Sequence, residues 1–202
     1  MTQTQKSFNA LLFFNISYLL FFGLIAVQAG KYEFFITAFF ISLPVALIYY
    51  FHKTLHIAPS IIAGLSVLGL LHVAGINIAV HGVRLYDLWF IQDILRYDNI
   101  IHLWGSFVLG LIIYSLLAPH LDQKIKHNLF LLALLIILLT IGVGVLNEIM
   151  ELFAVVFLNA GKEIGDYMNN ALDLLFNLLG AIPAGIIMSY YHRHDRIKIN
   201  QN

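Results

Sequence analysis

Cysteine is absent from the 202-residue chain, which removes disulfide bonds, thiol catalysis and thiolate metal sites at once. Charged residues are scarce, at 11%, whereas 60% of the residues are hydrophobic. So few charged residues cannot cover the surface of a soluble fold of this size, and the apolar composition excludes a disordered or collagen-like chain. The sequence therefore predicts a protein whose surface faces lipid.

Neither sign of charge is in excess, because the formal net charge is zero and the sequence pI is near 7.1. Nucleic acid is excluded as a partner, since phosphate binding needs a concentrated basic patch. Without thiols, the side chains of His, Asp, Glu and Asn are the expected metal ligands or acid and base groups. We therefore expect any chemistry to use nitrogen and oxygen donors.

Long apolar runs recur along the chain, and a helix of roughly 20 such residues crosses a bilayer. Six of them lie near residues 8–29, 34–51, 60–80, 99–118, 129–154 and 168–191. The connections between them are too short for a soluble domain, so we expect a single transmembrane domain over residues 1–202. The prediction is an all-α polytopic integral membrane protein, a bundle of about six transmembrane helices.

Positive charge is divided unequally between the two sides of such a bundle. With six spans, seven Lys and Arg fall on the side that holds both termini and four fall on the other. The positive-inside rule therefore predicts that both termini are cytoplasmic. Nine of the eleven acidic residues then fall at or near the outer side. Acidic residues hardly influence orientation, so topology alone does not explain why they gather there.

The connection over residues 81–97 mixes apolar and charged residues at roughly helical spacing. It contains Tyr86, Trp89 and Tyr97, aromatic residues that favour the membrane interface. Two interpretations stay open. The segment either lies flat on the outer leaflet or is an ordinary connecting loop with interfacial aromatic residues.

Polar clusters interrupt three of the apolar helices, and close spacing places residues of a cluster on one helical face. The clusters are Asp98 with His102 in the fourth span, Glu148 with Glu151 in the fifth, and Asp166, Asp173 and Asn177 at the sixth. In the six-span topology, the fourth and sixth helices begin outside and the fifth ends outside. We therefore expect the three clusters to converge at similar depth, within residues 97–180.

Carboxylates inside a membrane span persist only when they are paired, solvated or bound to a cation. No Lys or Arg lies within the clusters, so we expect the acids to repel one another unless a proton or a cation neutralises them. The expected ligands of a divalent metal are His102, Glu148, Glu151 and Asp173, a donor set that leaves zinc, manganese, iron and magnesium open. Such a metal can activate water or polarise a carbonyl or phosphoryl oxygen.

In this hypothesis the catalytic acids and bases are Glu148, Glu151 and Asp173, and the residues that orient or bind a ligand are Asp98, Asp166 and Asn177. Structural alternatives stay open for several of them. An Asp at a helix start is often a cap, an interhelical Asn often joins two helices, and His102 with one carboxylate is a simple hydrogen-bonded pair.

A resemblance to known families rests on the same residues. The motifs are Tyr97-Asp98-x3-His102, Glu148-x2-Glu151, Gly165-Asp166 and Asp173-x3-Asn177-x2-Gly180-Ala181. Together they are similar to the YjdF-like bacterial inner-membrane family, an uncharacterised group, and their order also resembles the wider VanZ-like membrane proteins. The resemblance covers roughly the C-terminal half. After Gly165-Asp166, the family pattern has an acidic residue where this chain has Asn169-Asn170.

The resemblance implies the cytoplasmic membrane of a prokaryote, and the VanZ-like association with low-level teicoplanin resistance implies a role at the outer face of the envelope. Our leading hypothesis is a metal-dependent hydrolase or transferase acting on a membrane lipid or a lipid-linked envelope molecule. The alternatives are a proton- or cation-coupled transporter or ligand-binding protein, and a scaffold held by a buried polar network. Transporter sites usually lie near mid-membrane between inverted repeats, whereas these acids lie near one end of their helices.

Overall fold

The computed structural model describes residues 3–30, 35, 38–39, 42–43, 46–47, 50–51, 57–158 and 167–199. Among these residues, five helices are long and apolar enough to cross a membrane: α1 (Gln3–Gln28), α3 (Pro59–Asn77), α4 (Tyr97–Leu117), α6 (Leu129–Leu158) and α8 (Tyr167–Ile199). The prediction of a helical, polytopic membrane protein is confirmed. The span expected near 34–51 falls largely outside the described residues.

Most observed helix boundaries lie close to the expected ones, although α1 begins at Gln3 instead of near residue 8 and α6 ends at Leu158 instead of near residue 154. Helix α8 continues to Ile199, beyond the expected end at 191. By contacts, the chain divides into two compact units, Met1–Ile101 and His102–Asn202. Each unit is described by itself below, and the single domain expected over the whole chain stays a prediction.

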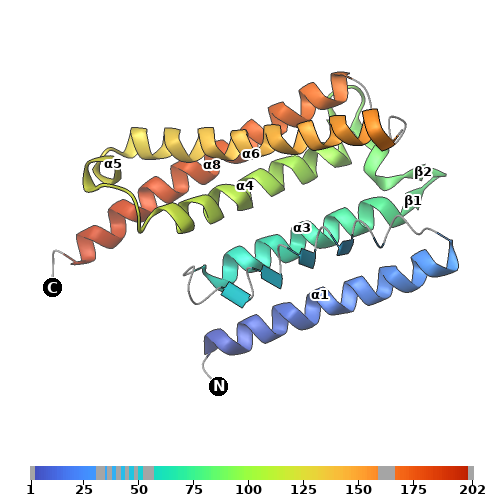
Figure 1. Cartoon of the computed structure of the whole chain (residues 1–202), viewed down its shortest axis with the longest axis horizontal. Coiled ribbons are helices and arrows are strands. Elements are labelled where there is room, and N and C mark those ends of the chain that lie inside the picture. Colours follow the sequence, from blue (N-terminus) through green and yellow to red (C-terminus); the bar gives the residue numbers. More distant parts are fainter. Residues whose placement is uncertain are drawn as a thin grey trace. The chain divides into compact units, whose positions relative to one another are not determined.

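In the first unit, helices α1 and α3 lie side by side (Figure 1). Tyr18, Phe22 and Ala26 follow one another at intervals of four along α1, so they share a face and pack on Val73 of α3. A buried polar group joins the same helices: Asn15 Nδ2 donates to Ser66 Oγ over 2.7 Å. The hydrogen bond fixes the position of α1 along α3, which apolar packing alone leaves free to slide.

Two short antiparallel hairpins follow α3, in the connection between two of the long helices. Strand β1 (Ala79–Val80) pairs with β2 (Val83–Arg84), and after a 3-10 turn, η1 (Leu85–Asp87), strand β3 (Trp89–Ile91) pairs with β4 (Leu95–Arg96). His81 and Gly82 have φ values of 52° and 82°, the pair of positive values that a tight two-residue hairpin turn requires. Residues 81–97 therefore form no continuous helix despite the spacing of their apolar residues, and both interpretations of this connection stay open.

In the second unit, the rest of α4, α6, α8 and the short helix α5 (Gln123–His127) pack together, with α8 in contact with both of its long neighbours (Figure 1). Two glycines permit these contacts. A Cβ atom on Gly180 would overlap the carbonyl oxygen of Leu103 in α4, and one on Gly185 would lie 2.9 Å from the carbonyl oxygen of Ala133 in α6. Small residues at such crossings let helix backbones approach closely in membranes.

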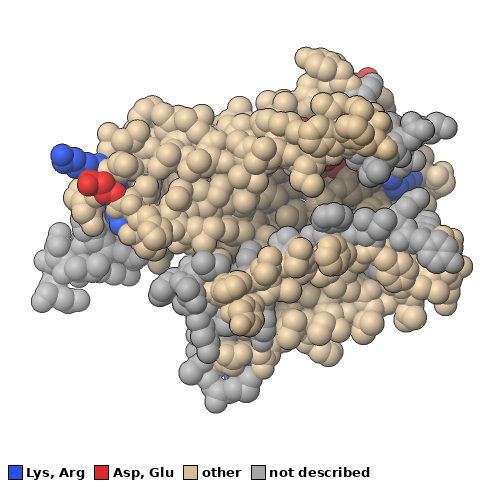
Figure 2. Space-filling model, in the orientation of Figure 1, with Lys and Arg blue, Asp and Glu red and all other residues tan. Residues whose placement is uncertain are grey.

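The outer surface of this unit suits a lipid environment. Phe130, Leu138 and Phe157, spread along α6, are 76%, 58% and 76% exposed. Figure 2 shows uncharged residues over most of the visible length of these helices, with charged side chains near their ends. An apolar surface of this extent is expected to face acyl chains rather than water.

Candidate metal centre

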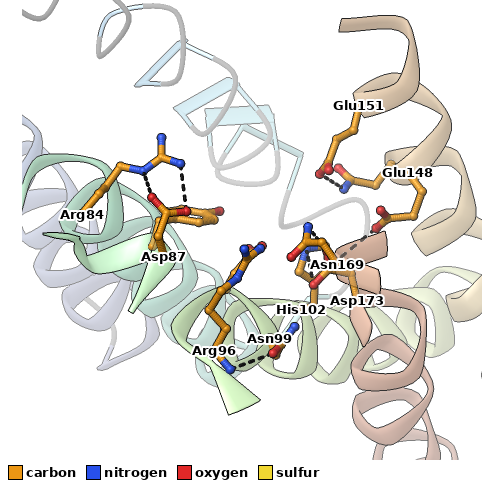
Figure 3. A network of polar contacts seen from close by, with 12 residues as sticks. Arg84, Asp87, Arg96, Asn99, His102, Glu148, Glu151, Asn169 and Asp173 are labelled. Carbon is orange, nitrogen blue, oxygen red and sulfur yellow. Dashed lines mark hydrogen bonds and ion pairs between the residues drawn. The ribbon is translucent and has the colours of Figure 1, made fainter. Parts of the chain in front are cut away.

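Helices α4, α6 and α8 bring one ionisable residue each to a common point. The Nδ1 atom of His102 lies 3.7 Å from Oε1 of Glu148, and its Nε2 atom lies 3.7 Å from Oδ1 of Asp173 (Figure 3). The Asp173 side chain is fully buried, and the other two are nearly so. The second unit therefore places a carboxylate beside each nitrogen of one imidazole ring.

Glu151 completes a set of donors on one side of this ring. One ligand atom each of His102, Glu148 and Glu151 lies within 4.8 Å of the other two, an arrangement that can hold a metal ion. Asn147 Nδ2 donates to Glu151 Oε1 over 2.8 Å, which orients that carboxylate (Figure 3). One nitrogen and two carboxylates form a donor set found for zinc, manganese and iron.

The Glu148 carboxylate has an unusual environment. The residue is only 7% exposed, yet neither of its oxygens accepts a hydrogen bond from the described part of the protein. Glu151 lies close by with a charge of the same sign, so the pair repels when both are ionised. A buried carboxylate without hydrogen bonds is costly, and a cation bound between Glu148 and His102 would remove this cost.

Asn177 and Ser106 form a second layer behind His102. The Oδ1 atom of Asn177 lies 3.3 Å from His102 Nδ1 and accepts a hydrogen bond from Ser106 Oγ over 2.7 Å. All of the Asn177 side chain is buried, and its Nδ2 packs over Gly144 of α6. Asn177 therefore joins α4 to α8, as the structural alternative expected, and it also contacts the His102 ring. Its role in positioning a ligand stays a prediction.

Asp173 is held by its own helix. Asn169 Nδ2 donates to Asp173 Oδ2 over 2.8 Å, and both residues are buried (Figure 3). This Asn stands in the stretch where the resembled family pattern has an acidic residue. An amide at this position supplies a donor to Asp173, whereas a carboxylate would add another negative charge.

Asp98 corrects one expectation. It forms an ion pair with Arg96, with 2.7 Å between Arg96 Nη2 and Asp98 Oδ2. The view that no basic residue neutralises these acids is therefore wrong for Asp98, because the last residue of β4 reaches the first turn of α4. Asp98 lies one turn before His102 on α4, and its role as an orienting residue stays a prediction. Asp166 lies outside the described residues.

Ser106 and Asn169 were not predicted from the sequence, although spacing carries a signal for each. Ser106 follows His102 by four residues, and Asn169 precedes Asp173 by four. Both therefore share a helical face with the ionisable residue they support. Hydroxyl and amide groups at such spacing are common in membrane helices, so the signal gains meaning only when the facing helix is known.

Comparison with known proteins gives a family. Residues 10–194 match the family described as Predicted membrane protein (DUF2238). The chain belongs to this family. The YjdF-like resemblance is thereby confirmed, whereas the resemblance to VanZ-like proteins is not shown. Searches of curated proteins and of solved structures find no match to this DUF2238 chain.

Proposed function

We propose that this DUF2238 protein is a metal-dependent enzyme of the prokaryotic cytoplasmic membrane, which hydrolyses or transfers a phosphoryl or acyl group of a lipid or lipid-linked envelope molecule. Its metal ligands are His102, Glu148 and Glu151, with Asp173 as either a further ligand or the partner of the second ring nitrogen. The observation that carries the proposal is the buried Glu148 carboxylate, which has no hydrogen-bond partner among the described residues and lies 3.7 Å from His102 Nδ1.

The geometry favours a cation over a simple pair. A hydrogen bond between His102 and Glu148 would bring the two atoms to about 2.7–3.2 Å, and the structure has them at 3.7 Å. In a tetrahedral site, ligands at about 2.0–2.2 Å from the metal lie about 3.3–3.6 Å from each other, which is longer than a hydrogen bond. His102 Nδ1 also lies 3.3 Å from the acceptor Oδ1 of Asn177, so this nitrogen must give up its proton to bind a metal. The bond between Asn147 and Glu151 keeps the second carboxylate in place.

The bound metal would supply a Lewis acid and an activated water. Glu151, oriented by Asn147 and partly accessible, is placed to act as the base that takes the proton from this water. Asp173 lies beside Nε2 of His102, and a carboxylate on the second nitrogen of a ligating His fixes the orientation of the ring. Glu151, which is partly accessible, thus serves as the base, and the buried Asp173 orients the His102 ring.

The depth of the cluster favours a lipid substrate. His102 is five residues into α4 and Asp173 is six into α8, which at 1.5 Å per residue is about 8–9 Å below those helix ends. Phosphate and ester groups of lipids lie in this part of a bilayer, between the water and the acyl chains. Met150 and Phe153, neighbours of Glu151 in sequence, are 62% and 55% exposed, so a lipid can approach α6 laterally. With both termini cytoplasmic, the cluster opens toward the outer leaflet.

Metal analysis of the purified protein tests the proposal. The wild type should retain about one divalent ion per chain, and Glu148→Gln should lose it. Asp122→Asn is the matched control, because Asp122 is an exposed acid that caps α5 and lies in no cluster. Equal metal content in the wild type and Glu148→Gln would refute the metal site.

Turnover needs a separate measurement. Metal-loaded protein in vesicles of bacterial lipid extract should release a headgroup, phosphate or fatty acid that mass spectrometry detects, and Glu148→Gln should release none. Metal binding without any lipid product would refute the enzyme and favour the alternative of a cation-coupled transporter or binding protein.

A further inference from the structure

The β3–β4 hairpin of the first unit presents large apolar side chains outward. Phe90, Ile91 and Ile94 are 51%, 52% and 59% exposed, around a turn formed by Gln92 and Asp93. Water-exposed hairpin tips are usually polar, because apolar residues there gain nothing from folding. Three large apolar residues at one turn therefore need a partner surface.

The hairpins are held firmly on α3, so the exposed residues belong to an ordered element. Tyr86 and His72 share a hydrogen bond of 2.7 Å between the hydroxyl oxygen and Nδ1, and Tyr97 donates to the carbonyl oxygen of Leu71 over 2.9 Å. Gly75 permits this packing, since a Cβ atom there would lie 2.5 Å from the Tyr86 ring. The aromatic residues thus attach the hairpins to α3. Phe90 contacts the Tyr97 ring with one side and remains half exposed, as do Ile91 and Ile94.

Chain connectivity keeps this tip close to the membrane. The first hairpin begins two residues after α3 ends at Asn77, and α4 begins directly after β4. Both helices are candidate membrane spans. Ile94 lies three residues before Tyr97, so it is at most about 10 Å from the start of α4. The surface within its reach includes the lipid that surrounds these two helices.

The charge of the hairpin segment excludes electrostatic attraction to lipid headgroups as the main cause of membrane contact. Arg84 is paired with Asp87 over 2.8 Å, and Arg96 is paired with Asp98. With Asp93 added, residues 79–98 carry two cations and three anions, a net charge of 2 − 3 = −1. The segment therefore has no excess of positive charge to bind anionic headgroups. The Arg96 guanidinium also lies 5.8 Å from the centre of the Trp89 ring, a pairing that suits the membrane interface.

We infer that the β3–β4 hairpin inserts Phe90, Ile91 and Ile94 into the interfacial layer of the bilayer, beside the helices it connects. The contact is apolar and requires no anionic lipid. It is independent of the metal centre, because none of the three inserted side chains is a proposed ligand.

Site-directed spin labelling tests this inference, and the absence of cysteine means that each engineered Cys is the sole labelling site. Nitroxide is attached at Ile94→Cys and, in a second protein, at Ile91→Cys, both in phosphatidylcholine nanodiscs. Gln123→Cys, exposed on the polar helix α5, serves as the reference in water. Leu138→Cys, 58% exposed and in the middle of the uncharged stretch 129–146 of α6, serves as the reference in lipid.

Relaxation by oxygen, which concentrates in lipid, is compared with relaxation by a water-soluble nickel chelate. The labels at 91 and 94 should show an oxygen-to-nickel ratio several-fold above the Gln123 reference and below the Leu138 reference. The ratio should not change when anionic lipid is added.

Three results would overturn the inference. A ratio equal to that of Gln123 would place the hairpin in water. Labels inaccessible to both reagents would indicate a protein partner instead of lipid. A high ratio found only with anionic lipid would show that headgroup charge, and not apolar insertion, holds the hairpin.

Discussion

Replacing Gly180 by Ala should destabilise the unit built from α4, α6 and α8. The new Cβ atom would overlap the carbonyl oxygen of Leu103 and lie 2.9 Å from its carbonyl carbon and 3.0 Å from the backbone nitrogen of Phe107. All three are backbone atoms of α4, so no rotation of a side chain can relieve the overlap. Helix α4 must move away from α8.

The expected loss follows from two opposing effects. Overpacking at a tight contact costs about 1–3 kcal/mol, and the upper end applies here because the contact is with rigid backbone. Alanine regains about 1 kcal/mol through its higher helix propensity. The free energy of unfolding should therefore fall by about 2 kcal/mol.

Gly142→Ala is the matched control, since it is also a helical glycine of this unit and a Cβ atom there would have no neighbour within 4 Å. It should leave stability unchanged or raise it by up to about 1 kcal/mol. Unfolding of both variants by a denaturing detergent, in mixed micelles, measures the difference. Because His102 precedes Leu103 on α4, metal affinity should fall in Gly180→Ala as well. If the two variants proved equally stable, the close contact between α4 and α8 would be refuted.

Two further predictions concern the metal centre. In the presence of a chelator, Glu148→Gln should unfold at the same temperature as the wild type or at a higher one. The substitution replaces a buried carboxylate that has no hydrogen-bond partner among the described residues. A clear loss of stability would support a structural network instead. Ser106→Ala should weaken metal binding several-fold, as measured by calorimetry, because Asn177 loses the hydroxyl that positions it. Ser189→Ala removes a similarly buried hydroxyl that donates to the Gly185 carbonyl oxygen of its own helix, and it should leave metal binding unchanged. Equal effects of the two substitutions would contradict the role of Ser106.

Sequence patterns predicted the long helices well, because crossing a bilayer requires a long apolar run whatever its neighbours are. The spacing of Glu148 and Glu151 on α6 follows from helix geometry in the same way. The convergence of His102 with Glu148 and Asp173 was inferred from one more assumption, that each helix reverses direction relative to the previous one. That inference needed only the depth of each polar residue in the membrane, and it did not need the contacts between helices.

Contacts that depend on the path of a connection could not be predicted in this way. The ion pair between Arg96 and Asp98 forms because β4 passes directly into α4, and no sequence pattern indicated that residues 95–96 are a strand. The hairpin itself depends on positive φ values at His81 and Gly82, and only the second is a residue that favours them. Interhelical partners such as Ser106 and Asn177 depend on how each helix is rotated, which hydropathy does not determine.

The position of the two glutamates along α6 has a consequence for how the protein is made. Residues 129–146, which precede them, carry no charged side chain and measure about 27 Å as a helix, nearly the thickness of the hydrocarbon layer. The helix can therefore partition into the bilayer as it leaves the ribosome, with Glu148 and Glu151 toward the far boundary, where a charge is less costly than at the centre. Asp173 is synthesised later, on α8. Assembly of the cluster must then follow insertion of α4 and α6, and it is completed when α8, the third of these helices in the chain, enters the membrane.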